Sequence, residues 1–221
     1  MSEISLTIAV LGGTGKEGKG LAYRWARAGY QVIIGSRVAE KAQTAAAEVT
    51  EMLNGKATVL GLDNLEAAQK AGLAVLTVPY SAHKDTLLAL KEALQGKILV
   101  DVTVPLVPPK VTKVQMPPAG SAAQEAVEIL GPGVEVVDAF QNISFEHLIH
   151  DETVPCDVLV TGSSKAARET VIQLVTAAGL TGWDAGPIEN SVVVEGLTSV
   201  LIYMNKQYGS THAGIKITGL K

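Results

Sequence analysis

A glycine-rich turn between an apolar strand and a helix constrains the fold of this chain more than any other feature. The strand is predicted at residues 5–12, and the helix begins near residue 16. The turn has the G-x-G-x-x-G pattern in the strand-to-helix position where that pattern is credible; its residues are Gly13, Thr14, Gly15, Lys16, Glu17 and Gly18. The first glycine permits the tight turn, the second lets the backbone approach a diphosphate, and the third lets the helix pack on the strand. Because N–H groups at the helix start would face the anion, the turn predicts a dinucleotide-binding site.

The end of the second predicted strand indicates which dinucleotide is preferred. This strand, residues 31–36, ends in Ser36 and Arg37, where an NAD-binding protein usually places an Asp or Glu for the ribose hydroxyls. Ser36 can donate to a 2′-phosphate, Arg37 can pair with it, and Lys41 adds a positive charge about one helical turn further on. An exposed Ser–Arg turn beside a solvated lysine is the competing interpretation. We expect NADP(H) rather than NAD as the cofactor.

Strand-length apolar runs alternate with helix-period segments, and this alternation predicts the fold class. It builds a parallel sheet through right-handed crossovers. The strands are predicted at residues 5–12, 31–36, 57–62, 73–79, 97–104 and 134–141, and the helices begin near residues 16, 39, 64, 81 and 121. Hydrophobic residues make up 47% of the chain and charged residues 18%, which suits a sheet covered on both faces. We predict an α/β protein with a doubly wound Rossmann-type parallel sheet and a small C-terminal α/β domain.

The pattern of elements changes near residue 156. A strand at 157–161, a helix at 164–178 and a longer helix at 189–208 form a second unit. We expect residues 1–155 to be the NADP-binding domain and residues 156–221 to complete the acceptor pocket and the dimer contact. The last helix is apolar over more than one narrow face, which predicts burial and hence a homodimer.

One long connection, residues 105–120, contains five prolines and cannot be regular helix or central strand. Loops of this length in compact domains usually cover or bind a ligand. The loop ends at Ser121, which has capping-box spacing with Gln124 and predicts the start of a helix.

Charge and composition exclude several classes of protein. The formal net charge is −4 with no basic stripe, so we expect no nucleic-acid partner and no membrane-surface patch. No apolar run approaches transmembrane length, and the N-terminal residues are unlike a signal peptide. The single cysteine, Cys156, lies among apolar residues and is predicted to be a reduced core thiol. These features predict a cytoplasmic protein.

The sequence indicates no catalytic side chain and no metal site. Its four histidines, His83, His147, His150 and His212, are dispersed, and the spacing of His147 and His150 fits surface histidines better than ligands. No nucleophile motif or signposted base occurs. Hydride transfer between two stacked rings needs close approach in a dry pocket and no obligatory protein acid. The sequence fits such chemistry, with catalysis by positioning.

The chain resembles the NADPH-dependent coenzyme F420 reductases, also called F420:NADP oxidoreductases. The resemblance rests, in order, on GGTGKEGKGLA, VIIGSR, AVLTVPY, VDVTVPL, PPAGSAAQEA, WDAGPIEN and HAGIKITGL, and it covers nearly the whole chain. It implies an oxidoreductase that moves a hydride between NADP(H) and the deazaflavin coenzyme F420. It also implies a dinucleotide-binding domain paired with a small C-terminal domain, usually in a homodimer.

The resemblance also implies roles for individual residues. Those expected to hold the dinucleotide phosphates are Thr14, Gly15, Ser36, Arg37 and Lys41. Those expected along the nicotinamide path and the ring stack are Val78, Pro79, Tyr80 and Ile143. Those expected to face the deazaflavin are Val104, Gln141, Asn142, Glu195, Thr198 and Leu201.

Two departures from the family pattern keep other acceptors open. Gln141 stands where a histidine is expected and Val192 where an arginine is expected, and both positions are associated with the anionic tail of the deazaflavin. One alternative is an NADPH-dependent reductase of another flavin-like or quinone-like acceptor. A second is a non-catalytic NADPH-binding regulatory protein. In each catalytic case the partner is a small-molecule redox acceptor.

Overall fold

The computed structural model describes residues 6–149 and 154–220. Its strands form one sheet in the order β3-β2-β1-β4-β5-β6-β7-β8. All neighbouring strands are parallel except β6 and β7, which are antiparallel. The strands are β1 Thr7–Leu11, β2 Gln31–Ser36, β3 Leu60–Asp63, β4 Leu73–Leu76, β5 Ile98–Asp101, β6 Glu135–Asp138, β7 Asp157–Gly162 and β8 Thr181–Pro187.

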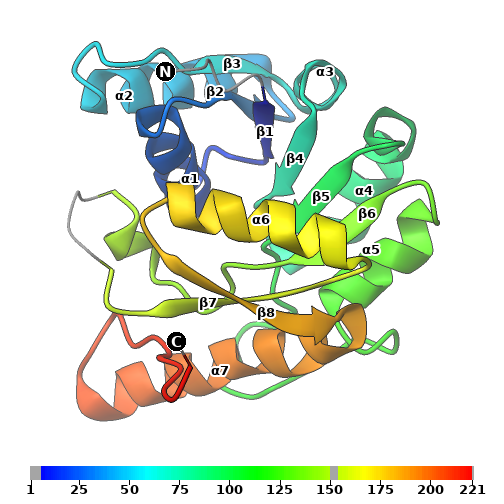
Figure 1. Ribbon diagram of the computed structural model, residues 1–221, viewed down its shortest axis with the longest axis vertical. Helices are drawn as coiled ribbons and strands as arrows, with labels where there is room; N and C mark the ends of the chain where they lie inside the picture. The colour runs from blue at the N-terminus through cyan, green and yellow to red at the C-terminus, as the bar shows by residue number, and fades with distance from the viewer. Residues whose placement is uncertain (1–5, 150–153, 221) are drawn as a thin grey trace.

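Helices cover both sides of this sheet (Figure 1). They are α1 Lys16–Arg27, α2 Ala39–Met52, α3 Asn64–Lys70, α4 Tyr80–Leu94, α5 Ala122–Leu130, α6 Lys165–Ala177 and α7 Ser191–Tyr208, with short 3₁₀ helices η1 Phe145–His147 and η2 Ile188–Asn190. Alternate side chains of a strand point to opposite faces. Ile8 and Val10 of β1 accordingly join a core with α1, α2 and α6, whereas Ala9 and Leu11 join a second core with α3, α4 and α5. The doubly wound Rossmann-type fold is confirmed.

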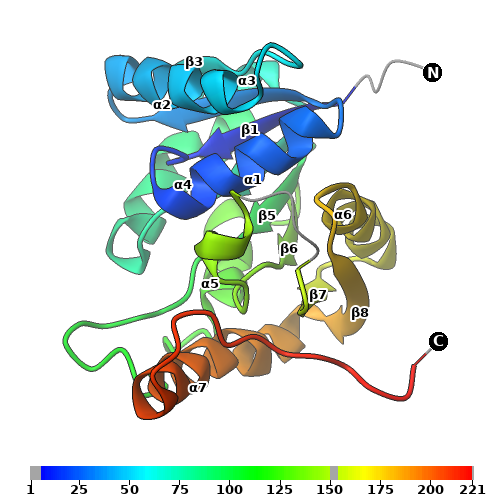
Figure 2. The same ribbon diagram turned by 90° about the vertical axis from the view of Figure 1, so that its left-hand side faces the viewer.

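The C-terminal unit continues the same sheet. β7 pairs with β6, and β8 pairs with β7 at the edge. Figure 2 shows α7 and the C-terminal tail lying below this end of the sheet, far from α2 and α3. One sheet therefore includes strands from both sides of the domain boundary predicted at residue 156. The assignment of residues 156–221 to a separate domain stays a prediction.

Strand β8 is absent from the sequence-based prediction, which has no strand between residues 178 and 189. Gly182, Gly186 and Pro187 are poor strand formers, so local propensity argues against a strand there. It forms because β7 supplies a hydrogen-bonding partner and α6 packs against it. The register shifts between Val160 and Thr161, a local irregularity that no alternation pattern reveals.

The predicted proline-rich loop is confirmed, since no helix or strand lies between β5 and α5. It ends where expected, with the Ser121 Oγ accepting a hydrogen bond from the Gln124 N–H at 3.0 Å. The loop packs on α7 at Gly196, where an added Cβ would lie 3.3 Å from the Met116 Cε. Ser199 of α7 donates to the Lys113 carbonyl. The loop is therefore attached to α7 as well as to the sheet.

Two other sequence expectations concern single features. Cys156 is a free thiol buried in the core, as the sequence predicts, and burial raises its pKa to about 11. Within the described residues, no helix combines the length and the apolar character needed to cross a membrane.

Candidate active site

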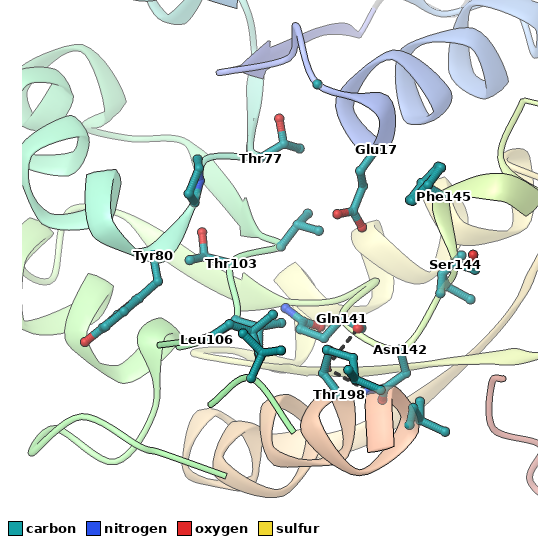
Figure 3. Close-up of a pocket in the computed structure, with 18 of the residues that line it drawn as sticks. Glu17, Thr77, Tyr80, Thr103, Leu106, Gln141, Asn142, Ser144, Phe145 and Thr198 are labelled. Carbon is teal, nitrogen blue, oxygen red and sulfur yellow. Dashed lines mark hydrogen bonds between the residues drawn. The ribbon is translucent and has the colours of Figure 1, made fainter. Parts of the chain in front are cut away.

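A cavity of about 850 Å³ lies at the carboxyl ends of β1, β4, β5 and β6 (Figure 3). In open α/β sheets, ligands bind at this edge, where the strand order reverses. Here the reversal falls between β1 and β4. One wall comes from the loops after these strands, and the opposite wall from the proline-rich loop, α7 and the C-terminal tail. The residues of that second wall are Leu106, Pro108, Val111, Thr198, Leu201, Ile202, Asn205, Thr211 and Ala213.

The glycines of the turn after β1 have different reasons to be glycine. Gly12 has a φ of +69° and an added Cβ would lie 2.4 Å from Val78. A Cβ added to Gly13 would lie 2.6 Å from the Val10 carbonyl oxygen, and a Cβ added to Gly18 would lie 2.6 Å from the Gly13 Cα. Gly15 alone of these four has no atom within 4 Å of such a Cβ, and its φ of −76° suits any residue. Protein packing thus requires three of the glycines, and the open space beside Gly15 fits an approaching ligand.

The end of β2 lies beside this turn. The Gly13 N–H donates to the Gly35 carbonyl at 3.0 Å, which brings Ser36 next to the glycine turn. Ser36 is buried, and its Oγ accepts a hydrogen bond from the Val38 N–H. Arg37 and Lys41 are exposed and lie outside the cavity lining. The end of β2 therefore carries a hydroxyl and a cation, with a second cation in α2 and no carboxylate at the strand end itself.

Residues expected along the nicotinamide path line the cavity between β4 and β5. They are Val78 and Pro79 before α4, Tyr80 at its start, and Ile143 after β6; Val104, expected to face the deazaflavin, lines the same cavity after β5. The Thr77 N–H donates to the Leu11 carbonyl at 2.9 Å, so the loop after β4 is fixed against β1. Ile143 is almost fully buried, which makes it a rigid apolar surface at the cavity floor.

Two carboxamides form the far end of the cavity. The Gln141 Nε2 donates to the Asp101 carbonyl at 2.7 Å and to the Asp138 carboxylate. The Asn142 Nδ2 donates to the Val194 carbonyl at 3.0 Å and to the Thr198 Oγ1 at 3.2 Å. The amide oxygens of Gln141 and Asn142 are buried and have no hydrogen-bond partner within the described residues.

An unpartnered buried acceptor costs about 1–3 kcal/mol, so these two oxygens fit a ligand that brings N–H or O–H donors. A nicotinamide carboxamide and the ring N–H of a deazaflavin are donors of this kind. The residues present therefore fit both groups that the sequence resemblance implies, and Figure 3 shows Gln141 and Asn142 at the same end of the cavity as Thr198.

Besides Ser36, Arg37 and Lys41, four residues predicted to bind ligands lie outside the cavity lining: Gly13, Lys16, Gly18 and Glu195. Glu195 is fully buried behind the cavity wall, and its carboxylate accepts from the Ala122 N–H at 2.7 Å and the Ala123 N–H at 3.0 Å, so it caps α5. Burial raises its pKa to about 8. Lys16 lies with its Nζ 4.8 Å from the centroid of the Phe145 ring, and Gly18 is buried in the α1–β1 packing. The other predicted residues, Thr14, Gly15, Glu17, Thr198 and Leu201, line the cavity.

Sequence reasoning missed a buried ionisable group beside the cavity. The His83 Nε2 lies 2.7 Å from the Asp101 Oδ2, and its Nδ1 lies 3.2 Å from the Glu125 Oε2. Burial alone would lower the pKa of His83, but Asp101 and Glu125 together raise it. Burial, Glu195 and Asp101 raise the pKa of Asp138 well above its usual value. The sequence signal that could have indicated this buried group was Asp101, an aspartate at the end of the apolar strand β5.

The other histidines lie apart from this group. The rings of His147 and His212 are 5.3 Å apart at the edge of the molecule. His150, the predicted surface partner of His147, lies outside the described residues. Taken together, the glycine turn, the strand-end cavity and the sheet order define a dinucleotide-binding α/β protein of the Rossmann class.

Comparison with known proteins identifies the family. Residues 7–105 match the family model described as "NADP oxidoreductase coenzyme F420-dependent". The chain is 40% identical to the F420-dependent NADP reductase of Methanocaldococcus jannaschii, over 98% of this chain and all of the relative. It is 43% identical to the reductase of the same name from Methanothermobacter marburgensis, over 97% of this chain and 99% of the relative. The chain belongs to the F420-dependent NADP reductase family, and the sequence resemblance is confirmed.

Solved structures support the same fold. A putative F420-dependent NADP reductase from an Arthrobacter species superposes with a TM-score of 0.80 and 25% identity, covering 97% of this chain and all of that one. An imine reductase from Myxococcus stipitatus has a TM-score of 0.61 and 18% identity, covering 93% of this chain and 63% of that one, and shows the shared fold alone.

Proposed function

We propose that this chain transfers a hydride between NADP(H) and coenzyme F420 within the strand-end cavity. One observation carries the proposal: residues of the glycine turn line one end of a single cavity, and Gln141 and Asn142 line the other. A dinucleotide held at the turn and a second planar ring therefore have room in one cavity of about 850 Å³. The names of the full-length relatives support this pair of substrates.

In the proposed complex, the phosphates lie on the turn around Thr14 and Gly15, with the 2′-phosphate meeting Ser36, Arg37 and Lys41. Bound NADP(H) would supply or accept the hydride at its nicotinamide ring. Val78, Pro79, Tyr80 and Ile143 would hold that ring within the cavity. These residues position the reacting carbons and exclude water, which are the terms that matter most for a direct hydride transfer.

The test is a mixture of protein, NADPH and purified F420, followed at the absorbance bands of both cofactors. The proposal expects equal loss of NADPH and of oxidised F420. Because Gln141 and Val192 are uncharged, the second candidate is a reductase of a less anionic flavin-like or quinone-like acceptor, and it expects NADPH loss only with those compounds. A non-catalytic NADPH-binding regulator would show tight binding and no turnover with any acceptor.

We further propose a homodimer assembled through α7, in a cytoplasmic protein. An exposed apolar face on a soluble domain commonly marks an association surface. α7 exposes apolar or aromatic side chains along its length: Val192, Val193, Val200, Tyr203, Met204 and Tyr208. Sedimentation at micromolar concentration tests this proposal, and a monomer there would contradict it. Replacing Val193 and Val200 with Asp is expected to give a folded monomer.

A further inference from the structure

The C-terminal tail, residues 210–220, forms part of the cavity wall although no helix or strand lies within it. Thr211 and Ala213 of the tail line the cavity together with Asn205 of α7. Figure 2 shows the tail returning from the end of α7 toward β7 and β8. A chain terminus keeps one position only where other groups tie it down. The shape of this wall therefore depends on the contacts that hold the tail.

The contacts of the tail near the cavity lie partly in solvent. The Ala213 N–H donates to the Asn205 Oδ1 at 2.9 Å. The Thr211 Oγ1 donates to the Glu146 Oε2 at 2.8 Å, and the Ser144 Oγ donates to the Thr211 carbonyl at 3.4 Å. Thr211 is exposed, and water competes for the groups of such hydrogen bonds, so each adds little net stability. These contacts alone would hold the tail weakly.

Asp157, the first residue of β7, holds the tail further along the chain. It is fully buried, and its N–H donates to the Ile215 carbonyl at 2.8 Å. Its carboxylate accepts from the Lys216 Nζ at 2.7 Å and from the Ile217 N–H at 2.9 Å. The same carboxylate accepts from the Trp183 Nε1 of β8 at 2.9 Å. Asp157 therefore joins three consecutive residues of the tail to the edge of the sheet.

The charge of Asp157 makes this attachment strong. Burial alone would raise the pKa of Asp157, but the hydrogen bonds from Lys216, Ile217 and Trp183 lower it below its usual value. At neutral pH the side chain is a buried carboxylate, and such a group is costly unless it is paired and hydrogen-bonded. The tail supplies the cation and a backbone N–H for this carboxylate. Asp157 in turn fixes the tail.

The stretch between this attachment and the cavity wall is a single residue, Gly214. A Cβ added to Gly214 would lie 2.7 Å from the Cys156 Cβ and 3.7 Å from the Asn142 carbonyl oxygen. Gly214 thus packs against the residue before Asp157 and near one of the two carboxamide residues of the cavity. Because Ala213 of the wall and Ile215 of the attachment are its two neighbours in the chain, a shift at Asp157 displaces the wall.

We propose that Asp157 is a positioning residue for the acceptor: it fixes the tail and thereby the part of the cavity wall that Thr211 and Ala213 form. This inference rests on the proposed function and deepens it. The tail belongs to the wall opposite the glycine turn, so the effect falls on the acceptor rather than on the dinucleotide. Asp157 lies outside the cavity lining and acts only through the tail.

The experiment compares wild-type protein with Asp157→Asn in steady-state assays with NADPH and F420. The variant keeps the size of the side chain but loses its charge, so the tail is released. The acceptor KM is expected to rise by about tenfold, since a lost wall contact weakens binding by about that order. The kcat and the NADPH dissociation constant should stay within about threefold, because only uniform binding of the acceptor is lost.

Asp184→Asn is the matched control. Asp184 of β8 also carries a carboxylate in an ion pair, with the Arg168 Nε at 2.7 Å, and it accepts from the Gly186 N–H. These partners lie outside the tail. The control should lose stability on thermal unfolding and keep the wild-type KM. Sedimentation checks that each variant keeps the oligomeric state of the wild-type protein.

Two further variants act on the tail itself and serve also where Asp157→Asn does not fold. Lys216→Met removes the cation, and Gly214→Ala forces the tail away from Cys156 while leaving the charge of Asp157 in place. Each should raise the acceptor KM and leave NADPH affinity unchanged. Asp157→Asn combined with Lys216→Met should raise KM no further than Asp157→Asn alone, because both remove the same contact.

Hydrogen exchange of residues 211–217, measured by mass spectrometry, shows whether the tail is released. Exchange should be faster in Asp157→Asn and unchanged in Asp184→Asn. Faster exchange with an unchanged acceptor KM would overturn the inference, and so would an equal rise of KM in Asp184→Asn. Either result would leave the proposed function intact. If the wild-type protein oxidises NADPH only with another flavin-like or quinone-like acceptor, the proposed function is wrong and the same comparison is made with that acceptor. No turnover with any acceptor would overturn both.

Discussion

The two walls of the cavity are built in different ways. The wall after β1 and β4 is fixed by backbone: Gly13 donates to Gly35, Thr77 donates to Leu11, and tight packing around the glycines leaves little freedom. The opposite wall depends on side chains from distant parts of the chain, with the Thr198 Oγ1 donating to the Gln141 carbonyl at 2.9 Å. A site fixed by backbone tolerates few substitutions, whereas a wall of side chains can change its ligand by exchanging them. Gln141, one of the two family departures predicted from the sequence, lines the cavity, whereas Val192 is exposed on α7 outside the lining.

Ile143 is a nearly buried residue of the cavity lining, and its replacement should have the largest effect. Ile143→Ala removes a buried surface beneath the proposed ring stack, and misplacement of reacting carbons by about 1 Å can cost on the order of a hundredfold in rate. Single-turnover hydride transfer, followed by stopped-flow absorbance, should fall by about that factor. NADPH affinity should change little, because the phosphates are held elsewhere. An unchanged rate would mean that the acceptor does not stack at this residue.

Arg37→Ala tests the exposed cation that follows β2, next to the backbone-built wall. Loss of a charged hydrogen bond to the 2′-phosphate should weaken NADPH binding by about 1–3 kcal/mol, which is about 5- to 150-fold. NADH lacks this phosphate and should bind the variant as it binds the wild-type protein. Fluorescence titration measures both. Lys56→Ala, at an exposed lysine beyond the other end of α2, is the control for loss of charge alone. Equal weakening of NADH and NADPH binding would contradict the assignment.

Two glycines of the same turn provide a matched pair. Gly15→Ala points a methyl group into open space, so stability should stay within about 1 kcal/mol of wild type while NADPH binds about tenfold more weakly. Gly18→Ala would place a Cβ 2.6 Å from the Gly13 Cα and should lower the free energy of unfolding by about 1–3 kcal/mol. Chemical denaturation and NADPH titration separate the two effects. A destabilised Gly15→Ala variant would show that Gly15 serves folding rather than binding.

Sequence reasoning succeeded where local patterns specify structure. Strand β2 lies at 31–36 as predicted, α1 begins at Lys16, and the Ser121 cap forms. Predicted strands such as 97–104 run past the observed end at Asp101, because the apolar run continues into the cavity lining after the ladder stops. β8 was missed because its residues take the strand conformation only through pairing with β7.

The candidate site shows the same division. Glycine-turn residues could be identified from spacing alone, since each has a local reason to be there. The buried contacts of His83 with Asp101 and Glu125 join α4, β5 and α5, and no spacing along the chain predicts them. Glu195 was assigned to the acceptor from the family resemblance, yet its oxygens are occupied by α5 amides. Whether it also influences the acceptor stays a prediction.

Thr198→Val tests the side-chain wall on its own. The variant keeps the shape but loses the hydrogen bonds to the Gln141 carbonyl and from the Asn142 Nδ2. A net hydrogen bond of about 1 kcal/mol corresponds to about fivefold, so the acceptor KM should rise by that order while NADPH affinity is unchanged. Thr176→Val, which removes an exposed hydroxyl of α6 that bonds to Ile172, is the matched control. If NADPH affinity falls instead, the two walls are not independent.

The smallest effect on turnover is expected at the histidines. His83, His147 and His212 all lie outside the cavity lining, so His83→Gln, His147→Ala and His212→Ala should each keep turnover within about threefold, far from the 10²–10⁴-fold that loss of a general acid costs.

His83 should instead affect stability. Asp101 and Glu125 raise the pKa of His83 in the folded state. Protonated His83 therefore contributes its full stabilisation at pH values below the unfolded-state pKa near 6.5, and this stabilisation is lost as the pH rises through the folded-state pKa. The difference in Tm between wild type and His83→Gln should therefore be largest below about pH 6 and shrink at alkaline pH. A difference that grows with pH would mean that His83 is neutral in the folded protein, and a large loss of turnover in His83→Gln would mean that the hydride transfer does need this side chain.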